Sequence, residues 1–515
     1  MSSGWRDRVA GLFDSKKQRY DYTALPEDPY DREEETQSRV STPWADRRNL
    51  AIRFAGAALI LAVVGVFVVS FTQIDEEQQT CDYVHSGFQC KPVISHKWGQ
   101  YSPFYSVPSD ISTDIPAGCE VTFAQILSRH GARDPTGHKS VAYAELIDHI
   151  QASVTEYGHH YEFLKDYEYT LGSDELTTFG QQQLVNSGIK FYERYENLAR
   201  NFSPFVRSAG QKRVVDSAVN WTQGFHQARL ADKHAVESPD PYPYSLLLLP
   251  EVQGFNNTLS PSTCPAFHGG GDDSYGPKEV WADIFLPPIT ERVNQNLIGA
   301  NLTNADIIYL MDICPFETVA KTDGRLSSIC SLFREDEWDS YDYYQTLGKW
   351  YGYTNGNPLG PTQGVGFVNE LIARLTNQPV NDTTTTNSTL DGSDETFPLN
   401  AMLYADFSHD NDMSGVFGAL GLYNATLPLS NSTKASPLKS RGYAASWVVP
   451  FAARMFVEKM RCEGIDEEMV RVLINDRVIP LQNCDVDAQG RCSLSEFVES
   501  LGFARQGGHW DMCDE

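Results

Sequence analysis

The chain has 515 residues, 41% of them hydrophobic and 12% aromatic, so it can bury a large core, and a disordered or collagen-like chain is excluded. The 68 acidic and 41 basic side chains give a formal charge of −27. This charge argues against nucleic acid as a partner, because non-specific binding requires lysine and arginine at the phosphates. Ten cysteines are compatible with five disulfides and an oxidising compartment.

The charge is distributed unevenly along the chain. Residues 1–53 hold ten basic and ten acidic side chains, and the rest of the chain carries the whole excess of −27. Residues 1–53 also show little hydrophobic periodicity, so they are predicted to form a disordered cytosolic tail.

An uncharged run of 18 residues, Phe54–Phe71, follows this tail. Extended to Ile74, it is long enough to cross a bilayer, so a transmembrane helix is predicted over 54–74. Basic residues precede the run and acidic residues follow it: Arg47, Arg48 and Arg53, then Asp75, Glu76 and Glu77. The positive-inside rule then predicts a single-pass type II membrane protein. A core helix would keep an amphipathic stripe and a cleaved signal peptide would begin near residue 1, so both fit less well.

Two further features support this orientation, with the N-terminus cytosolic and the rest lumenal or extracellular (secretory pathway, vacuole or cell surface). All ten cysteines, from Cys81 to Cys513, lie beyond the run. So do eight sequons for N-linked glycans, at Asn201, Asn220, Asn256, Asn301, Asn381, Asn387, Asn424 and Asn431. The polar stretch 381–389 is predicted to be a glycosylated surface loop.

Short apolar runs at both ends of the remaining chain are typical of strands. Such runs occur at 126–127, 402–404 and 470–474, whereas 366–375 has apolar residues at helical spacing. Early and late strands with helical segments between them predict an α/β sheet built from both ends of the chain, with a helical insertion.

The segment from Gln125 to Pro135 carries the clearest chemical signal. An apolar strand runs into Arg129-His130-Gly131, followed by Arg133. Two guanidinium groups around an imidazole suit a phosphoryl group, whose oxygens accept paired hydrogen bonds from arginine, and the imidazole can attack phosphorus. Gly131 is expected to let the backbone approach the ligand. By itself, a surface Arg-His-Arg loop remains an equal alternative.

Two further segments fit the same chemistry. His409-Asp410 ends the strand-like run from Tyr404 and could supply one phosphate donor and one proton for a leaving oxygen. Arg207 follows a short apolar run and could add a third guanidinium. Taken alone, each is a weak signal.

Together these segments resemble the histidine acid phosphatase family, and specifically its fungal phytase branch (3-phytase A-like). The resemblance covers about residues 80–513 and extends to the runs 357–366, 404–411, 419–424, 471–481 and 502–505. It implies a phosphoric monoester hydrolase that works at acid pH through phosphohistidine, without metal or cofactor. The substrates it implies are phytate (myo-inositol hexakisphosphate) or a broad range of organic phosphates.

The resemblance also implies roles for individual residues. His130 is the implied nucleophile and Asp410 the general acid. The implied phosphate ligands are Arg129, Arg133, Arg207 and His409. Lys139 and Lys349 match substrate-rim positions. Five disulfides are implied: Cys81–Cys90, Cys119–Cys462, Cys264–Cys513, Cys314–Cys330 and Cys484–Cys492.

The implied fold is a phosphoglycerate-mutase-like large α/β domain with a smaller helical insertion, preceded here by one transmembrane helix. The expected organisation is a tail over 1–53, an anchor over 54–74, a lumenal stalk and N-terminal extension over 75–118, and a histidine acid phosphatase domain over 119–515. The helical insertion is expected within about 136–340.

Some positions depart from the family pattern. Asp134 replaces an aromatic residue, and Gly348 and Ala142 stand where lysine is common. Losing cations and adding a carboxylate should weaken phytate binding more than monoester binding, so we expect a broad acid phosphatase that still accepts phytate.

Alternatives remain at this stage. Asp485-x-Asp487-x-Gln489, with Glu496, has calcium-loop spacing, but glutamine replaces a ligand, no helix precedes it and two cysteines flank it. A mutase fits poorly with secretion and disulfides. A catalytically inactive, glycosylated membrane protein that binds phosphorylated ligands would not need to keep both catalytic motifs.

Overall fold

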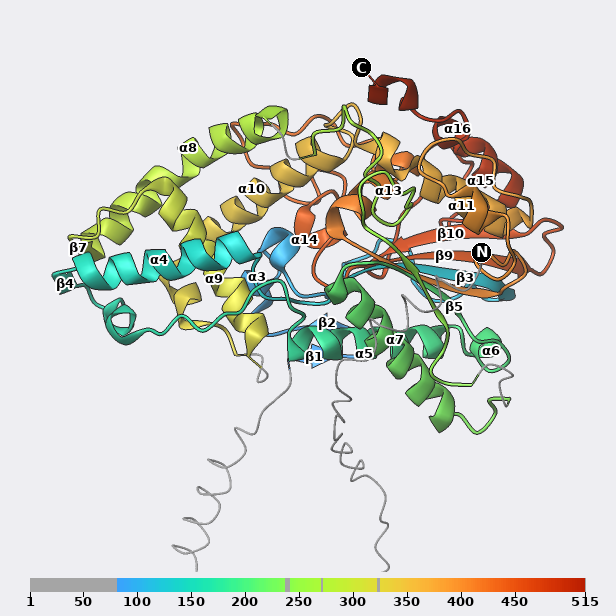
Figure 1. The fold of residues 1–515 in the computed structure, drawn as a ribbon, viewed down its shortest axis with the longest axis horizontal. Coiled ribbons are helices and arrows are strands. Elements are labelled where there is room, and N and C mark those ends of the chain that lie inside the picture. Colours follow the sequence, from blue (N-terminus) through green and yellow to red (C-terminus); the bar gives the residue numbers. More distant parts are fainter. Residues whose placement is uncertain (1–80, 237–240, 270–271, 322–324, 515) are drawn as a thin grey trace, which may run out of the picture. The chain divides into compact units, whose positions relative to one another are not determined.

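In the computed structural model of the chain, the described residues are 81–236, 241–269, 272–321 and 325–514 (Figure 1). The chain divides into two units, 1–77 and 78–515, and all described residues belong to the second. The predicted tail over 1–53 and the predicted transmembrane helix over 54–74 lie outside the described residues. Within the described ranges, no helix has both the length and the apolar character needed to span a bilayer.

An eight-stranded mixed sheet lies at the centre of this unit. Its strand order is β11-β10-β9-β3-β8-β5-β6, and β12 pairs with β10. The bounds are β3 Cys119–Arg129, β5 Phe205–Ala209, β6 Leu246–Leu249, β8 Leu403–Ser408, β9 Arg454–Cys462, β10 Met469–Ile474, β11 Arg477–Val478 and β12 Cys492–Ser493. The strands predicted at 126–127, 402–404 and 470–474 are therefore confirmed, apart from Met402, which precedes β8.

Four neighbouring strands of this sheet run parallel. Arg129 of β3 pairs with Ser408 of β8, and β5 and β6 continue in the same direction. On the other side of β3, β9 and β10 run antiparallel. The carboxyl ends of β3, β8, β5 and β6 therefore meet at one edge, where ligands bind in open α/β sheets.

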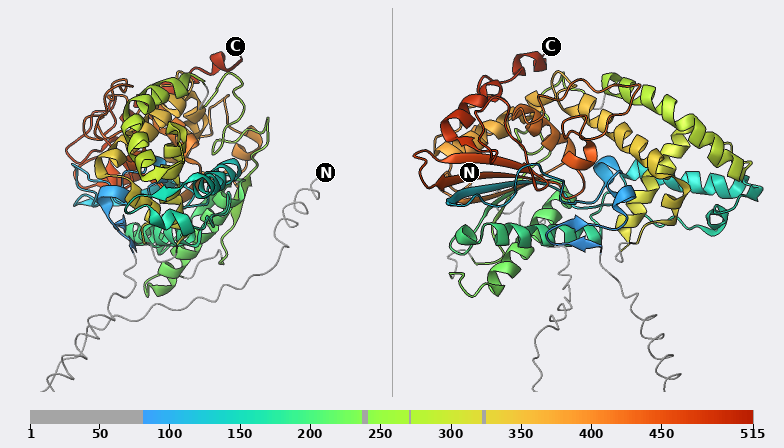
Figure 2. Two further views of the ribbon diagram at one scale, coloured as in Figure 1. Left: turned by 90° about the vertical axis from the view of Figure 1, so that its left-hand side faces the viewer. Right: turned by 180° about the vertical axis from the view of Figure 1, so that it is seen from behind.

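Helices cover both faces of the sheet (Figures 1 and 2). One face carries α5 (Thr178–Arg194) and α7 (Lys212–Ala231), and Trp221 of α7 packs edge-on against Phe407 of β8. The two helices approach closely through glycine, because a Cβ on Gly224 would collide with the carbonyl of Val185. The other face carries α11 (Val365–Thr376), α13 (Asp410–Ala419), α15 (Leu494–Ser500) and α16 (Gly502–Arg505). The helix predicted over 366–375 is confirmed in α11.

A second group of helices lies beside the sheet, towards the left of Figure 1. It consists of α4 (Gly137–Ser153), α8 (Asp272–Asn296), α9 (Asn304–Ala320) and α10 (Glu335–Tyr353). The structure corrects the expected limits of 136–340, because β5, β6, α5 and α7 of the sheet layer fall inside that range and α10 continues beyond it. The helical group is therefore assembled from separate segments of the chain.

The described part of the expected stalk, from residue 81 to residue 118, is packed into the fold. It contains β1 (Asp82–Tyr83), β2 (Gly87–Phe88), α3 (Pro92–Ser95) and η1 (Gly99–Tyr101). Phe88 and Trp98 are fully buried in the core. These residues do not form a stalk, because burying their aromatic side chains in the core removes apolar surface from water, which is favourable.

The polar stretch 381–389 is the predicted surface loop only in part, because its two ends are exposed and its middle is buried. Thr384, Thr385 and Thr386 are buried. The Asp382 carboxylate accepts hydrogen bonds from the backbone and hydroxyl of Thr384 and the hydroxyl of Thr386, and Asn369 of α11 donates to it as well. Hydrogen bonds to Asp382 therefore satisfy the side chains of Thr384 and Thr386 and let the middle of the stretch pack inward.

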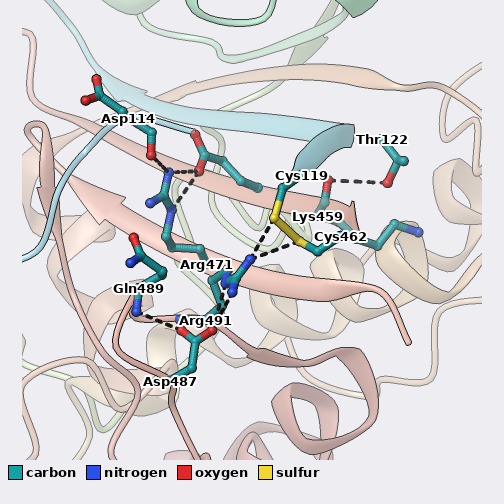
Figure 3. Close-up of a disulfide and its surroundings, with 10 residues drawn as sticks. Asp114, Cys119, Thr122, Lys459, Cys462, Arg471, Asp487, Gln489 and Arg491 are labelled. Carbon is teal, nitrogen blue, oxygen red and sulfur yellow. Dashed lines mark hydrogen bonds and ion pairs between the residues drawn. A yellow bond between two sulfur atoms is a disulfide. The ribbon is translucent and has the colours of Figure 1, made fainter. Parts of the chain in front are cut away.

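Five disulfides join the same pairs that the resemblance implies. Cys119–Cys462 links β3 to β9, and Figure 3 shows Arg491 over its two sulfur atoms. Arg491 is held by Asp487, which accepts 2.6 Å and 2.9 Å hydrogen bonds from the guanidinium. The loop with calcium-like spacing is therefore organised by an internal ion pair.

The remaining elements are short connections. They are β4 (Glu156–Tyr157) and β7 (Leu297–Ile298), α6 (Glu196–Ala199), α12 (Ser388–Asp391) and α14 (Ala445–Val448), and the 3₁₀ turns η2 (Glu162–Asp166), η3 (Ser328–Leu332), η4 (Pro361–Gly364) and η5 (Trp510–Asp514).

Candidate active site

His130 follows directly after β3, at the carboxyl edge of the parallel strands. Its ring is buried, and Nδ1 donates a 2.8 Å hydrogen bond to the carbonyl oxygen of Gly131. That bond places the proton on Nδ1 and leaves the Nε2 lone pair available. Burial, reinforced by Arg129 and Arg133, holds the pKa of His130 well below its usual value. Both effects favour the neutral imidazole, whose Nε2 lone pair can act as a nucleophile.

The loop after His130 is held by α5 and α7. The backbone amide of Gly131 donates to Ser217 Oγ at 3.1 Å, and that of Ala132 donates to Gln183 Oε1 at 3.0 Å. A Cβ on Gly131 would collide with the carbonyl of Gly180 in α5. Gly131 is thus required for close packing against a helix, which corrects the expected role of admitting a ligand.

Arg129 lies beneath the nucleophile and is almost fully buried. Its Nη1 donates to the carbonyl oxygens of Gln100 and Val449, and its Nη2 lies 3.3 Å from Asp410 Oδ2. Burial is the main cause that lowers the pKa of Arg129 to about 10. Because the group remains cationic throughout the acid range, it can bind a phosphoryl oxygen.

The third arginine of the cluster is Arg213, the second residue of α7, and not Arg207. The charge of Arg213 acts on His130, Arg133 and Asp410, and burial together with Arg133 lowers its pKa. Arg213 makes one long ion pair, 3.8 Å to Asp174. Its guanidinium can therefore take part in phosphate binding.

Arg207 has a different environment because it lies inside β5, where it pairs with Asp406 of β8. Its Nε donates to Asp406 at 2.8 Å and its Nη2 to Glu370 at 2.6 Å, and all three side chains are buried. Arg374 Nη1 also donates to Asp406, at 2.7 Å. The predicted role of Arg207 as a phosphate ligand is therefore corrected: its charge is neutralised within a structural network.

His409 and Glu251 extend the site across the next two strands. His409 follows β8 and Glu251 follows β6 by two residues. The His409 Nε2 lies 3.1 Å from Glu251 Oε1, and the pKa of Glu251 is lowered against the cost of burial mainly by this contact. Glu251, which the sequence analysis missed, therefore orients the ring of His409.

Asp410 is the first residue of α13, beside His409. Its Oδ2 lies 2.6 Å from Lys349 Nζ of α10 and 3.3 Å from Arg129 Nη2. Arg129 and Lys349 hold the pKa of Asp410 well below its usual range, although burial acts in the opposite direction. The structure therefore brings the expected nucleophile and the expected acid into one charge cluster.

The two expected rim lysines have different settings. Lys349 is buried against Asp410 and Asn411. Lys139 of α4 donates at 2.8 Å to the buried Asp312, which also accepts from Tyr143 at 2.6 Å and from Tyr341. The Asp134 carboxylate is half-buried beside Gly172, where burial raises its pKa. Lys349 thus contacts the expected general acid, whereas Lys139 pairs with Asp312.

Comparison with known proteins agrees with this geometry. The model of the histidine phosphatase superfamily (branch 2) matches residues 120–475. This chain belongs to that superfamily. It is 51% identical to Phytase A of Aspergillus oryzae over 461 residues, covering 88% of this chain and 97% of the relative, and 52% identical to Phytase A of Emericella nidulans, covering 85% and 94%.

Solved structures show the same fold at lower identity. The phytase from D. castellii has a TM-score of 0.67 at 21% identity and covers 85% of this histidine phosphatase and 91% of that chain. A multiple inositol polyphosphate phosphatase of Bifidobacterium longum, in complex with inositol hexasulfate, has a TM-score of 0.56 at 14% identity, with 79% and 97% covered.

We expect the two arginines of this histidine phosphatase to respond differently to substitution. Arg213→Met removes a phosphate ligand, so kcat for an aryl phosphate should fall about 100-fold or more while the thermal midpoint stays near wild type. Arg207→Met leaves Asp406 and Glu370 short of a buried cation, so the free energy of unfolding should fall by about 3–5 kcal/mol. Steady-state kinetics and urea unfolding measure the two effects. A stable Arg207→Met enzyme with selectively lost kcat would contradict the assignment.

Lys349 should set the alkaline limit of activity. A general acid must be protonated, and Lys349 lowers the pKa of Asp410; removing the cation raises that pKa and extends activity to higher pH. For Lys349→Met, the alkaline limb of kcat/KM for an aryl phosphate should move up by about one pH unit. Lys139→Met, which removes a cation that pairs with Asp312 instead, is the matched control and should leave the limb in place. An unchanged limb in Lys349→Met would exclude this coupling.

Proposed function

We propose that this protein is an acid phosphatase of the 3-phytase type that removes phosphate from phytate and also from simpler organic phosphates. The observation that carries the proposal is the unprotonated Nε2 of buried His130 among Arg129, Arg133, Arg213 and His409, with Asp410 in the same cluster. The relatives named Phytase A, at about half identity over nearly their whole length, support phytate as a substrate.

The first half of the reaction forms a phosphohistidine. His130 Nε2 attacks phosphorus, the P–O bond to the alcohol breaks, and the Asp410 carboxyl gives its proton to the leaving oxygen. In the complex, Arg129 and Lys349 form ion pairs with the bound phosphate, and the phosphate adds negative charge beside Asp410. Both changes raise the pKa of the Asp410 carboxyl. The Nδ1–H bond to Gly131 stabilises the charged imidazole that results.

The second half releases the enzyme. The Asp410 carboxylate accepts a proton from water, the water oxygen attacks phosphorus, and the P–N bond breaks to give inorganic phosphate and neutral His130. The arginines and His409 hold the phosphoryl oxygens in both steps, so the developing charge meets fixed cations. Acid pH favours this cycle because Asp410 needs its proton, whereas His130 stays unprotonated.

A chemical trap and a substrate comparison test this function together. The catalytic unit is mixed with a ³²P-labelled aryl phosphate at acid pH, quenched in alkali and digested, and we expect label on His130 that is absent in His130→Ala. Specificity constants for phytate and the aryl phosphate are then compared. Label absent from the wild type, or equal label in His130→Ala, would overturn the mechanism and favour an inactive binding protein. A wild type without phytate turnover would remove phytate from the substrates.

We further propose that the enzyme is anchored as a type II membrane protein with the catalytic unit lumenal or extracellular. The apolar run 54–74, the arginines before it, and the confinement of cysteines and sequons to the later part of the chain support this. Several sequon asparagines have exposed side chains suited to N-linked glycans, namely Asn201, Asn301, Asn381, Asn424 and Asn431.

Topology can be measured on the full chain in microsomes. With an N-terminal epitope tag, we expect the protein to resist carbonate extraction, the tag to be digested by added protease, and the catalytic unit to be protected and shifted by endoglycosidase. Replacing three leucine or valine residues within 54–74 by lysine is the control and should release the protein. A protected tag or carbonate-soluble wild type would refute the anchor.

A further inference from the structure

The side chain of Gln183 lies on the face of α5 that packs against the loop after His130. This packing is close because of two glycines: a Cβ on Gly131 would collide with the carbonyl of Gly180, and a Cβ on Gly180 with that of Ala132. Gln183 follows Gly180 by three residues and therefore shares its helix face. The residue is only 2% exposed. The two glycines thus bring a buried amide against the nucleophile loop.

One peptide group connects this amide to the imidazole. The backbone N–H of Ala132 donates to Gln183 Oε1 at 3.0 Å. The accepting atom must be the oxygen, because a side-chain amide nitrogen is a donor and not an acceptor. The carbonyl at the other end of the same peptide belongs to Gly131, and it accepts the 2.8 Å hydrogen bond from His130 Nδ1. Gln183 and His130 therefore hold opposite ends of the Gly131–Ala132 peptide.

Other residues hold the peptides on either side of this one. Ser217 Oγ accepts a hydrogen bond from the backbone amide of Gly131 at 3.1 Å. The carbonyl of Ala132 accepts from the amide and the hydroxyl of Thr177, at 3.0 Å and 3.2 Å. The path of the loop is thus anchored on both sides of the Gly131–Ala132 peptide. What Gln183 adds is a hydrogen bond to the peptide that the imidazole also contacts.

We propose that Gln183 is a positioning residue that acts on His130 through this peptide and keeps the Nε2 lone pair available for attack on phosphorus. A hydrogen bond to the N–H end of a peptide increases the negative charge on its carbonyl oxygen, which then accepts more strongly. The Gly131 oxygen therefore holds the proton on Nδ1 and fixes the plane of the ring. It also stabilises the positive charge that the imidazole gains when phosphohistidine forms. This role rests on the proposed function, because it concerns the nucleophile of that reaction.

Steady-state kinetics of substitutions at Gln183 test this role. Gln183→Met keeps the length of the side chain but removes the acceptor oxygen, so kcat for an aryl phosphate should fall about tenfold. KM should change less than twofold, because the Gln183 oxygen bonds to the loop and not to the substrate. Gln183→Glu keeps an acceptor oxygen and should recover most of kcat.

A matched control lies one residue earlier on α5. Gln182 is exposed and donates to Asn186 at 2.9 Å, so Gln182→Met should change neither kcat nor KM. A rise in KM without a loss of kcat in Gln183→Met, or no recovery in Gln183→Glu, would overturn the positioning role.

The tautomer of His130 provides a readout that does not require turnover. In solid-state ¹⁵N spectra of the full-length protein labelled at histidine, the His130 signals are those that His130→Ala removes. At neutral pH the wild type should show Nδ1 protonated and Nε2 unprotonated, whereas Gln183→Met should show both tautomers. Ser217→Ala loosens the neighbouring peptide but leaves the one between Gln183 and the ring, so it should keep the wild-type signals.

The spectra separate a specific link to the imidazole from a general loosening of the loop. Unchanged signals in Gln183→Met, or an equal change in Ser217→Ala, would assign Gln183 a structural role and overturn the inference. A second tautomer in Gln183→Met, together with a wild type that hydrolyses no phosphate ester, would sustain the link to His130 and overturn only the proposed hydrolysis.

Discussion

The parallel pairing of β3 with β8 is the constraint on which the site depends. It sets Arg129 opposite Ser408, so the next residues along each strand, His130 and His409, emerge at the same edge. Extending the parallel set to β5 and β6 brings Arg213 and Glu251 to that edge from segments far apart in sequence. A one-residue shift in the register of any of these strand pairs would move side chains to the opposite face of the sheet, because side chains alternate between faces. The site residues would then no longer meet at one edge.

The distribution of buried charge follows from this arrangement. Below the edge, Arg207 and Arg374 are balanced by Asp406 and Glu370, so the sheet carries ions without a net charge. At the edge, Arg129, Arg133 and Arg213 surround His130, and their positive charge favours the binding of a phosphate dianion. The chain as a whole is strongly acidic, so the carboxylates outside this small cationic region repel an anionic substrate. This repulsion weakens at low pH, where carboxylates become protonated.

The sequence predicted the α/β sheet, the nucleophile, the acid and two of the three arginines of the site, because those residues sit in short motifs directly after apolar strands. It misplaced the third arginine, since choosing between Arg207 and Arg213 requires knowing where β5 ends. The useful signal was that Arg129, His130, Arg133, Arg213, His409 and Asp410 lie at or shortly after the end of a parallel strand, whereas Arg207 lies within β5. Residues that distant helices bring to the site, such as Ser217 of α7 at the backbone amide of Gly131, have no local sequence pattern. The buried threonines after Asp382 show the same limit, because composition alone cannot reveal hydrogen bonds that satisfy a polar loop.

The position of β3 at the middle of the sheet also affects biosynthesis. Its neighbours β8 and β9 begin at Leu403 and Arg454, so 273 residues separate the end of β3 from the start of the nearer one. At typical translation rates, about 15–60 s pass between the synthesis of β3 and the arrival of β8. During that interval an eleven-residue, largely apolar strand lacks both of its sheet partners. The nascent chain therefore needs protection from aggregation until nearly all of it has been made, and the nucleophile is assembled only after its last partners emerge.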